Sequence, residues 1–193
     1  IQTSGPYGGG VFAICVDTPF VYTTAGKVGV YMSSDNGFNW IKVNNGIEGL
    51  ETTSLIKISG NIFLGTQYGG IFKSSNNGST WIEINNGLPP ITNLEITGFA
   101  TNGNDIFVGT NGGVYVSSDF GLNWNERNNG LGVIKIYNII TSGPNLFATS
   151  LDSIFFSADS GLNWTNINAG LNIFFIQSIA MIDTTVFLSG YQN

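Results

Sequence analysis

The sequence predicts an all-β protein, a β-propeller built from four-stranded antiparallel blades. First, the stretch SSDNGFNW at residues 33–40 returns as SSNNGSTW at 74–81, SSDFGLNW at 117–124 and SADSGLNW at 157–164. Second, the tryptophans that end these stretches stand at positions 40, 81, 124 and 164, so the sequence repeats every 40 to 43 residues. Third, each period contains four short apolar runs bounded by turn residues, which is the pattern of a propeller blade.

Each apolar run has the length and composition of a β-strand. In the second period the runs are TSLIKISG, NIFLGTQ, GGIFKSSN and STWIEINNG, and the third and fourth periods keep the same order. Gly, Asn, Asp or Pro closes each run, as hairpin turns require. A parallel β-solenoid is the rival fold, but it lacks a cycle of four hairpin-connected strands. We therefore expect a single propeller region over residues 1–193, with blades at approximately 10–46, 51–87, 92–130 and 137–170 and a partial blade at 173–193.

The composition favours short strands and argues against several classes of function. Only 9% of the residues are charged, where about 25% is usual. The net charge is −6 and Lys and Arg together number six, so no basic stripe is available for nucleic acid. No apolar run is long enough to cross a membrane as a helix. The chain has no His, so Cys15 cannot form a Cys–His pair, and we expect it to be a small buried hydrophobe.

The repeated stretch resembles the Asp-box, Ser-x-Asp-x-Gly-x-x-Trp, of the BNR-type repeats in sialidases, sortilin-type receptors, xyloglucan hydrolases and secreted bacterial propellers. In those families the motif is the turn between the third and fourth strands of a blade, and the families that share it have unrelated functions. Three copies carry the Asp and the second copy has Asn in its place. The resemblance implies a structural role for Asp35, Trp40, Asn76, Trp81, Asp119, Trp124, Asp159 and Trp164.

The chemistry of the motif agrees with a structural role. The Asp carboxylate and the Ser hydroxyl can bond N–H groups of the turn, the Gly permits a positive φ, and the Trp can wedge between neighbouring sheets. A calcium loop would need alternating oxygen ligands, which this spacing lacks. Asn76 suits a hydrogen-bond acceptor better than a catalytic nucleophile. We expect no metal and no cofactor, and we expect all four tryptophans to be largely buried against adjacent blades.

The strand runs add up to about four and a half blades. A closed propeller contains about four to eight complete blades and leaves no exposed sheet edge. We expect this chain to be part of a larger ring that is completed by further blades. The alternative is that copies of the chain associate to close a ring.

A ligand site is expected at the end of the blades opposite the Asp-box turns, which we call the top face. There the loops between second and third strands meet the loops between blades, and alignment of the innermost strands places small neutral groups around a channel mouth. The simpler alternative is that these groups only contact water. The residues that we expect to bind a ligand are Thr53, Thr92, Tyr137 and Gln177, with Tyr137, Tyr68 or Phe174 as a stacking platform.

Enzymatic sites fit the sequence less well. Sialidases hold their substrate with a cluster of arginines, whereas Arg127 is the only Arg of this chain and falls in an outer strand. The start of the chain resembles xyloglucan hydrolases, but their catalytic Asp would fall at Ala25–Gly26. Glycoside hydrolysis ordinarily needs two carboxylates. Glu48, Glu51 and Asp152 lie in top-face loops and leave a pair open, with solvated loop charges as the simpler interpretation.

Two functions follow from this reading. The favoured one is a non-catalytic extracellular or cell-surface propeller, bacterial and secreted, that acts as a binding or scaffold module for a protein or carbohydrate. The alternative is a fragment of a propeller glycoside hydrolase, sialidase-like or xyloglucanase-like, with its catalytic carboxylates partly in other blades. The repeat also resembles photosystem assembly propellers, which rely on basic patches that this acidic chain lacks. Whether the chain is an enzyme stays open at this point.

Overall fold

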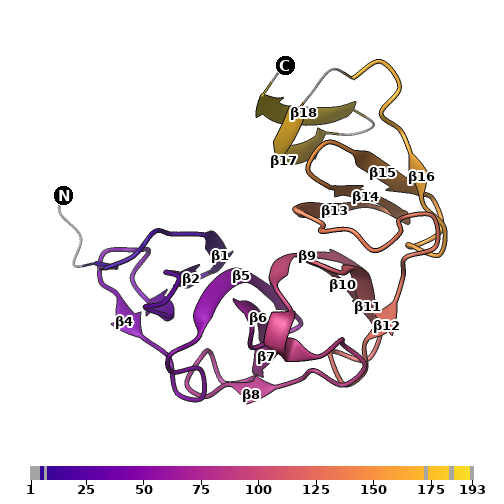
Figure 1. Ribbon diagram of the computed structural model, residues 1–193. Helices are drawn as coiled ribbons and strands as arrows, with labels where there is room; N and C mark the ends of the chain where they lie inside the picture. The colour runs from indigo at the N-terminus through magenta and orange to yellow at the C-terminus, as the bar shows by residue number, and fades with distance from the viewer. Residues whose placement is uncertain (1–4, 7, 172–173, 183–184, 192–193) are drawn as a thin grey trace. The chain divides into compact units, whose positions relative to one another are not determined.

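Antiparallel β-sheets make up nearly all of the regular secondary structure. A computed structural model describes residues 5–6, 8–171, 174–182 and 185–191 (Figure 1). Within these residues the chain forms four sheets of four strands, one sheet of two strands and a single 3₁₀ turn, η1 (Ile91–Asn93). The predicted all-β class with four-stranded antiparallel units is therefore confirmed.

The strands of each sheet follow one another in chain order. The first sheet contains β1 (Ala13–Asp17), β2 (Phe20–Thr24), β3 (Val30–Ser33) and β4 (Ile41–Lys42), and the second contains β5 (Glu51–Ile58), β6 (Asn61–Gln67), β7 (Ile71–Ser74) and β8 (Ile82–Glu83). The third contains β9 (Ile96–Asn102), β10 (Asp105–Thr110), β11 (Gly113–Ser117) and β12 (Asn125–Glu126). The fourth contains β13 (Asn138–Ser142), β14 (Asn145–Thr149), β15 (Ile154–Ser157) and β16 (Thr165–Asn166), and the last contains β17 (Phe174–Ile182) and β18 (Thr185–Tyr191).

Tight turns explain why the strands pair with their neighbours in sequence. Between β5 and β6, Ile58 pairs with Asn61, and the two residues of the turn have positive φ angles, 48° at Ser59 and 77° at Gly60. A two-residue turn of this kind matches the twist of an antiparallel pair, and Gly adopts it without a steric penalty.

Beyond the end of each fourth strand, an Asn side chain makes hydrogen bonds to backbone groups at the start of the third strand. In the first sheet the Asn44 amide oxygen accepts from Val30 N at 2.8 Å, and its amide nitrogen donates to the Val28 carbonyl at 2.8 Å. Asn85, Asn128 and Asn168 accept in the same way from Ile71, Val114 and Ile154. Since the side chain satisfies backbone groups beyond the strand end, a fourth strand of two residues is sufficient.

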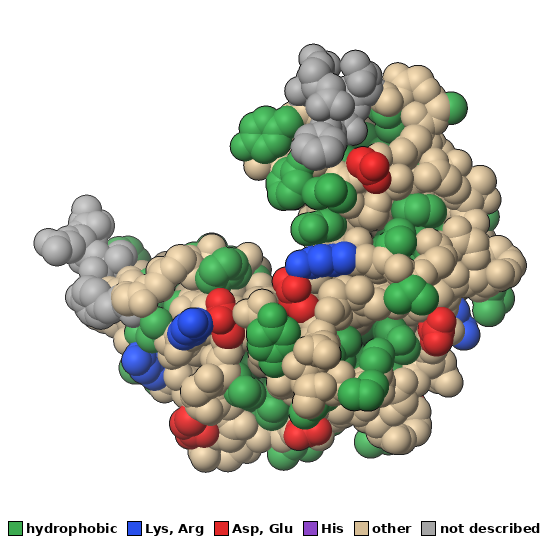
Figure 2. Space-filling view, in the orientation of Figure 1, with side chains coloured by type: hydrophobic (Ala, Val, Ile, Leu, Met, Phe, Trp, Pro, Cys, Tyr) green, Lys and Arg blue, Asp and Glu red, His purple; other side chains and the backbone are tan. Residues whose placement is uncertain are grey.

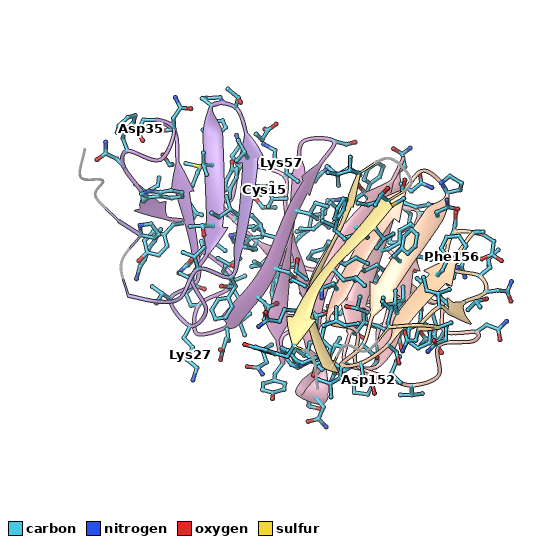
Figure 3. All side chains as sticks on the ribbon, turned by 90° about the horizontal axis from the view of Figure 1, so that it is seen from above. Cys15, Lys27, Asp35, Lys57, Asp152 and Phe156 are labelled. Carbon is cyan, nitrogen blue, oxygen red and sulfur yellow. The ribbon has the colours of Figure 1, made fainter. Side chains whose placement is uncertain are left out.

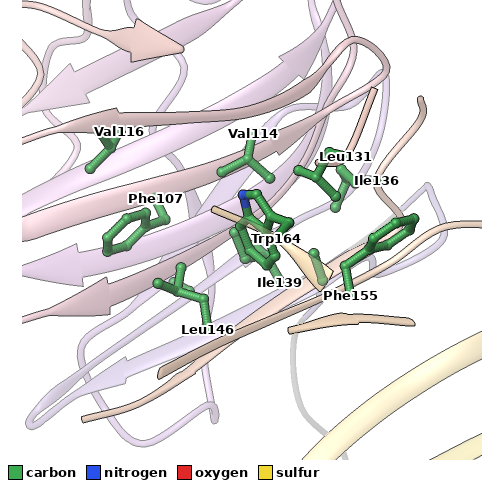
Figure 4. Packing of buried hydrophobic residues seen from close by; sticks show 11 residues of the cluster. Phe107, Val114, Val116, Leu131, Ile136, Ile139, Leu146, Phe155 and Trp164 are labelled. Atoms are coloured by element: carbon green, nitrogen blue, oxygen red, sulfur yellow. The ribbon is translucent and has the colours of Figure 1, made fainter. Parts of the chain in front are cut away.

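The chain divides into two compact units, each with its own hydrophobic core. One unit comprises Ile1–Asn85 and Pro89–Ile96, and the other comprises Asn86–Leu88 and Thr97–Asn193. The core of the first gathers Tyr22, Val30, Leu55, Leu64 and Trp81 among others. In the second, Trp164 lies among Val114, Leu131, Ile136 and Ile139 (Figure 4). The second strands are buried on both faces, which explains why they read as continuous apolar runs such as NIFLG.

Two of the four repeated tryptophans, Trp81 and Trp164, join one sheet to the preceding sheet of the same unit. Trp81 is 4% exposed, its backbone N–H donates to the Asn45 carbonyl at 2.9 Å and its indole N–H donates to the Val43 carbonyl at 2.7 Å. Trp164 makes the equivalent bonds to the carbonyls of Asn129 and Arg127 at 2.9 and 2.8 Å. Trp124 is 3% exposed and its backbone N–H donates to Asn86. Trp81 and Trp164 thus lie between two sheets of one unit, as the motif predicts, and Trp124 is buried within its own unit.

Trp40 corrects the prediction that all four tryptophans are buried. It is only partly buried, and its indole N–H donates to the carbonyl of Gly37 within its own turn at 3.0 Å. The physical reason is that Trp40 belongs to the first sheet, so the described residues offer no preceding sheet for it to contact. Ile14 and Val16 of β1 are 64% and 66% exposed on the same sheet.

Candidate functional site

The four Asp-box-like turns, here called the repeat turns (33–40, 74–81, 117–124 and 157–164), share one hydrogen-bond network. In the first, Ser33 Oγ donates to Asp35 Oδ1 at 2.8 Å and accepts from Gly37 N at 2.8 Å. Asp35 also accepts from the backbone and side-chain nitrogens of Asn39, at 2.8 and 2.6 Å. The third and fourth turns repeat these bonds around Asp119 and Asp159.

These hydrogen bonds hold the turn carboxylates within the turn and keep them ionised. The side-chain amide of Asn163 is the main cause that lowers the pKa of Asp159 to about 2, followed by the Asn163 backbone N–H and the Ser157 hydroxyl. The pKa values of Asp35 and Asp119 are lowered by the equivalent groups. A carboxylate that is held ionised by three donors is a poor proton donor and has few free lone pairs for a ligand. The geometry therefore fits a structural role.

Asn76 reproduces the network without a charge. Its Oδ1 accepts from Ser74 Oγ at 2.9 Å and from Thr80 N at 2.9 Å, and its Nδ2 donates to Thr80 Oγ1 at 2.8 Å. Where the other turns pair Asp with Asn four residues later, this turn pairs Asn with Thr, so donor and acceptor remain matched. The turn needs an acceptor at this position and does not need a carboxylate.

Loops between second and third strands lie at the other end of each sheet. Figure 3 shows this for the first sheet, where Asp35 marks the repeat turn at one end and Lys27 marks the opposite loop. The hairpin connection of consecutive strands requires this separation. Residues predicted to bind a ligand belong to this second end.

Of the predicted ligand-binding residues in the first unit, Thr53 makes a hydrogen bond within the fold. Thr53 Oγ1 donates to the Ile96 carbonyl at 2.5 Å, so this hydroxyl is already engaged. Tyr68 is 56% exposed, has a φ of 66°, and its backbone N–H donates to Leu94. Thr92 is exposed within η1. Tyr68 and Thr92 thus remain accessible, whereas Thr53 serves the fold.

In the second unit the structure brings two of the predicted residues together through an aromatic cluster. The rings of Tyr137 and Phe175 meet edge to face at 5.9 Å between centroids, and those of Phe175 and Tyr191 lie 6.2 Å apart. Gln177 Nε2 donates to the Tyr191 hydroxyl at 3.3 Å. Tyr191 is 61% exposed, and Tyr137 and Phe175 are half-buried. We call Tyr137, Phe175, Gln177 and Tyr191 the aromatic cluster.

Sequence reasoning found Tyr137 and Gln177 but missed the other two members. It named Phe174, whose side chain lies outside the described residues. A register shift separates Phe174 from Ile176 in the pairing of β17 with β18, and Phe175 has a φ of 61°. The broken alternation moves Phe175 to the accessible side, and nothing in the sequence marks that shift. Tyr191 could have been found by extending the hairpin register from Ile182 and Thr185 to the far end of β18.

A cation also lies beside this cluster. The Lys135 ammonium stands 5.1 Å from the centroid of the Tyr137 ring, a cation–π distance. Charged side chains are few, and most of the face shown in Figure 2 is uncharged. The aromatic cluster therefore sits in mainly neutral surroundings.

Each of the three candidate catalytic carboxylates contacts a nearby polar group. Glu48 Oε2 accepts from Gly46 N at 3.0 Å, and Glu51 Oε2 lies 3.9 Å from Lys27 Nζ. Asp152 Oδ1 accepts from Ser153 Oγ at 3.1 Å. Ala25 is 2% exposed and the Gly26 carbonyl accepts from both Thr52 N and Thr52 Oγ1, so Ala25–Gly26 forms part of the sheet connection.

Cys15 lies beside the ion pair of Lys57 and Asp17, in which the Lys57 side chain is largely buried and the Asp17 side chain is 52% exposed. Lys57, whose side chain is 10% exposed, bonds Asp17 at 2.5 Å and stands over the rings of Phe20 and Tyr22, and Figure 3 shows Cys15 next to it. Burial raises the pKa of the Cys15 thiol, and burial also raises the pKa of Tyr22 to about 12. Cys15 is half-buried, not fully buried as predicted, and at neutral pH its thiol stays protonated.

Within the described residues, no three His, Cys, Asp or Glu side chains converge as metal ligands would. A search of the same residues for a helix long and apolar enough to span a membrane finds none.

Comparison with known proteins shows the fold and leaves the family open. No family model and no curated protein matches the sequence. The structure is similar to YCF48 bound to D1 peptide, with a TM-score of 0.72, 16% identity, and coverage of 93% of this chain and 60% of that one. It is also similar to the extracellular domain of the putative one-component system BT4673 from B. thetaiotaomicron, with a TM-score of 0.70, 15% identity, and coverage of 91% and 24%.

A third similar structure is a glycoside hydrolase. The GH74 xyloglucanase from Xanthomonas campestris gives a TM-score of 0.64 at 14% identity, over 84% of this chain and 32% of that one. The chain thus spans about a third of the length of the xyloglucanase. The chain has the fold of a partial β-propeller, and identities this low carry nothing beyond the fold.

Proposed function

We propose that this chain is a non-catalytic propeller module, of the Asp-box type and extracellular or displayed at a cell surface, that binds a carbohydrate. The observation that carries the proposal is the aromatic cluster. It combines three partly accessible rings with a neutral amide at the end of the sheets opposite the repeat turns.

The chemistry of the cluster suits a sugar. Aromatic faces pack against the C–H faces of a pyranose, and the Gln177 amide and Tyr191 hydroxyl can exchange their mutual hydrogen bond for bonds to sugar hydroxyls. Each such bond is worth about 0.5–1.5 kcal/mol, so a single site would bind modestly and would gain from several copies on one surface. An extended peptide is the alternative ligand for the same groups.

The absence of turnover is part of the proposal. Three repeat-turn carboxylates are ionised and hydrogen-bonded within the scaffold, and Glu48, Glu51 and Asp152 each pair with a group of their own or a neighbouring loop. Ordinary glycoside hydrolysis requires an acid and a second carboxylate about 5–10 Å apart around one glycosidic bond.

One observation favours a second candidate function. Several similar structures are GH74 enzymes, and this chain covers only 26–32% of two of them. The chain would then be a piece of a glycoside hydrolase whose catalytic pair involves residues of other blades. The extracellular location rests on the motif and on the extracellular domain among the similar structures.

The test combines a glycan array with a panel of chromogenic glycosides, both applied to the purified chain. We expect binding to a subset of neutral glycans, weakened at least about tenfold by Tyr137→Ala, and no glycoside turnover. Phe38→Ala is the matched control, because Phe38 is a 46% exposed aromatic of a repeat turn. Turnover that disappears in Glu48→Gln or Glu51→Gln would support the hydrolase instead. Binding lost in Phe38→Ala and kept in Tyr137→Ala would refute the site.

A further inference from the structure

The last sheet has a core-type strand at an open edge. β18 has the sequence TVFLSGY, similar to NIFLGTQ of β6 and DIFVGT of β10. β6 and β10 are almost wholly buried, whereas β18 alternates between exposed and half-buried residues, and Phe187 is 52% exposed. β6 and β10 also have a strand on each side, while β18 pairs only with β17 among the described strands.

A second open feature belongs to the preceding sheet. A Gly with positive φ follows each four-stranded sheet, and three of these four glycines contact the backbone of a repeat-turn Trp. A Cβ on Gly46, Gly87 or Gly130 would collide with the carbonyl oxygen of Trp81, Trp124 or Trp164, respectively. The fourth equivalent, Gly170, has a φ of 83°, and such a Cβ there would have no atom of the described residues within 4 Å.

The neighbours of Gly170 are uncovered as well. Ile167 and Leu171 are 38% and 43% exposed, whereas Leu131, the equivalent of Leu171 one sheet earlier, is 5% exposed. By position, the carbonyls of Ile167 and Ala169 correspond to those of Arg127 and Asn129, which accept from the indole and backbone N–H of Trp164. We call Ile167, Ala169, Gly170 and Leu171 the open Trp socket.

We propose that the free edge of β18 and the open Trp socket together form a docking site for a β-hairpin that carries a Ser-x-Asp-x-Gly-x-x-Trp turn. The first hairpin strand would pair with β18, and the Trp at the start of the second would enter the socket. The contact continues an arrangement that the chain already makes once within each compact unit, at Trp81 and at Trp164, which fixes the chemistry of the partner.

The two halves of the site supply different parts of the recognition. Strand addition at an open edge gives main-chain hydrogen bonds, which are largely independent of sequence. The Trp gives the specificity, because a buried aromatic in a preformed pocket is the typical anchor of an interface. The socket uses backbone carbonyls, so Ala169 can replace the Asn of the other three copies.

The site can be tested with a hairpin taken from the chain itself. The probe is a fluorescein-labelled peptide of residues 153–170, SIFFSADSGLNWTNINAG, titrated with the full chain and followed by fluorescence anisotropy. We expect saturable binding, weakened at least about tenfold when the peptide carries Trp164→Ala. We expect a similar loss when the chain carries Gly170→Ala, since the added methyl group occupies the place of the Trp carbonyl.

Gly60→Ala is the matched control for the chain. Gly60 has a φ of 77° and nothing within 4 Å of an added Cβ, so its replacement carries a backbone strain like that of Gly170→Ala without touching the socket. Peptide binding should be unchanged in Gly60→Ala. Hydrogen exchange at the amides of β18 should slow when the peptide is bound.

Three results would overturn the proposal. They are no binding of the unmodified peptide, equal binding of the Trp164→Ala peptide, and peptide binding without slower exchange in β18. None of them depends on whether the aromatic cluster binds a sugar, so this proposal and the proposed function fail independently.

Discussion

Replacing Trp81 and Trp40 separately should show that the repeated Trp stabilises the fold through the preceding sheet. Trp81 is 4% exposed and its indole N–H donates to the Val43 carbonyl of that sheet. A buried Trp removes about 150–250 Å² from water, worth about 4–6 kcal/mol at 25 cal/mol per Å². Measured large-to-small changes of this kind cost about 3–5 kcal/mol, which we expect for Trp81→Ala. Trp40 lies in the same compact unit, but it is only partly buried and its indole N–H donates to Gly37 of its own turn. Trp40→Ala should therefore cost about 1–2 kcal/mol.

The assay is urea unfolding followed by far-ultraviolet circular dichroism, which does not depend on the Trp that has been removed. Both variants act on one unit, so the same transition is compared even if the two units unfold separately. The reasoning would be refuted if Trp40→Ala destabilised the protein as much as Trp81→Ala. A loss below about 1 kcal/mol for Trp81→Ala would equally contradict it.

Further predictions concern the repeat turns and the ion pair of Lys57 and Asp17. Ser157→Ala should cost about 1–3 kcal/mol in urea unfolding, because the buried Gly161 N–H loses its acceptor, while the exposed Ser189→Ala should be neutral. The pKa of Asp159 is about 2 when folded and about 3.9 when unfolded, so its contribution is complete above pH 4 and is lost as the pH falls through 2. The stability difference between wild type and Asp159→Asn should therefore shrink between pH 4 and pH 2, and a constant difference would contradict the assigned hydrogen bonds. Asp17→Asn should destabilise the protein by about 1–2 kcal/mol because the largely buried Lys57 ammonium loses its ion-pair partner and keeps the Asn77 amide oxygen, at 3.4 Å, as a polar contact. Lys57→Met should change stability by less than about 1 kcal/mol, because it removes the charge together with its need for a partner. The reverse order in thermal unfolding would show that Lys57 is not held by this ion pair.

The sequence predicts the fold well because its signals are local and repeated. The regular spacing of the Trp residues predicts repeated sheets, the Gly of each repeat turn predicts a tight turn, and the apolar runs predict buried second strands. Each of these features depends on residues close together in the sequence, and the structure contains all three. Asn76 was a useful variant, since it indicates that the turn needs an acceptor and not a charge.

The candidate site was less predictable because it depends on irregular backbone. Phe175 joins the cluster where a register shift and a positive φ interrupt the strand, and the pattern FF does not predict that irregularity. Thr53 looked like a free hydroxyl in the sequence but bonds a carbonyl 43 positions away. The exposure of Trp40 depends on what precedes its sheet in space, which a motif shared by four repeats cannot encode.

The most direct test of the central claim, that the repeat turns are scaffold and that ligand binding occurs at the opposite end of the sheets, is an NMR titration. The chain labelled with ¹⁵N would be titrated with the glycan that binds best on the array, and amide shifts would be mapped along the sequence. We expect the largest shifts at Tyr137, Phe175, Gln177 and Tyr191, with the turn glycines Gly37, Gly121 and Gly161 unmoved. Shifts centred on those turn glycines, with the aromatic cluster unmoved, would contradict the account.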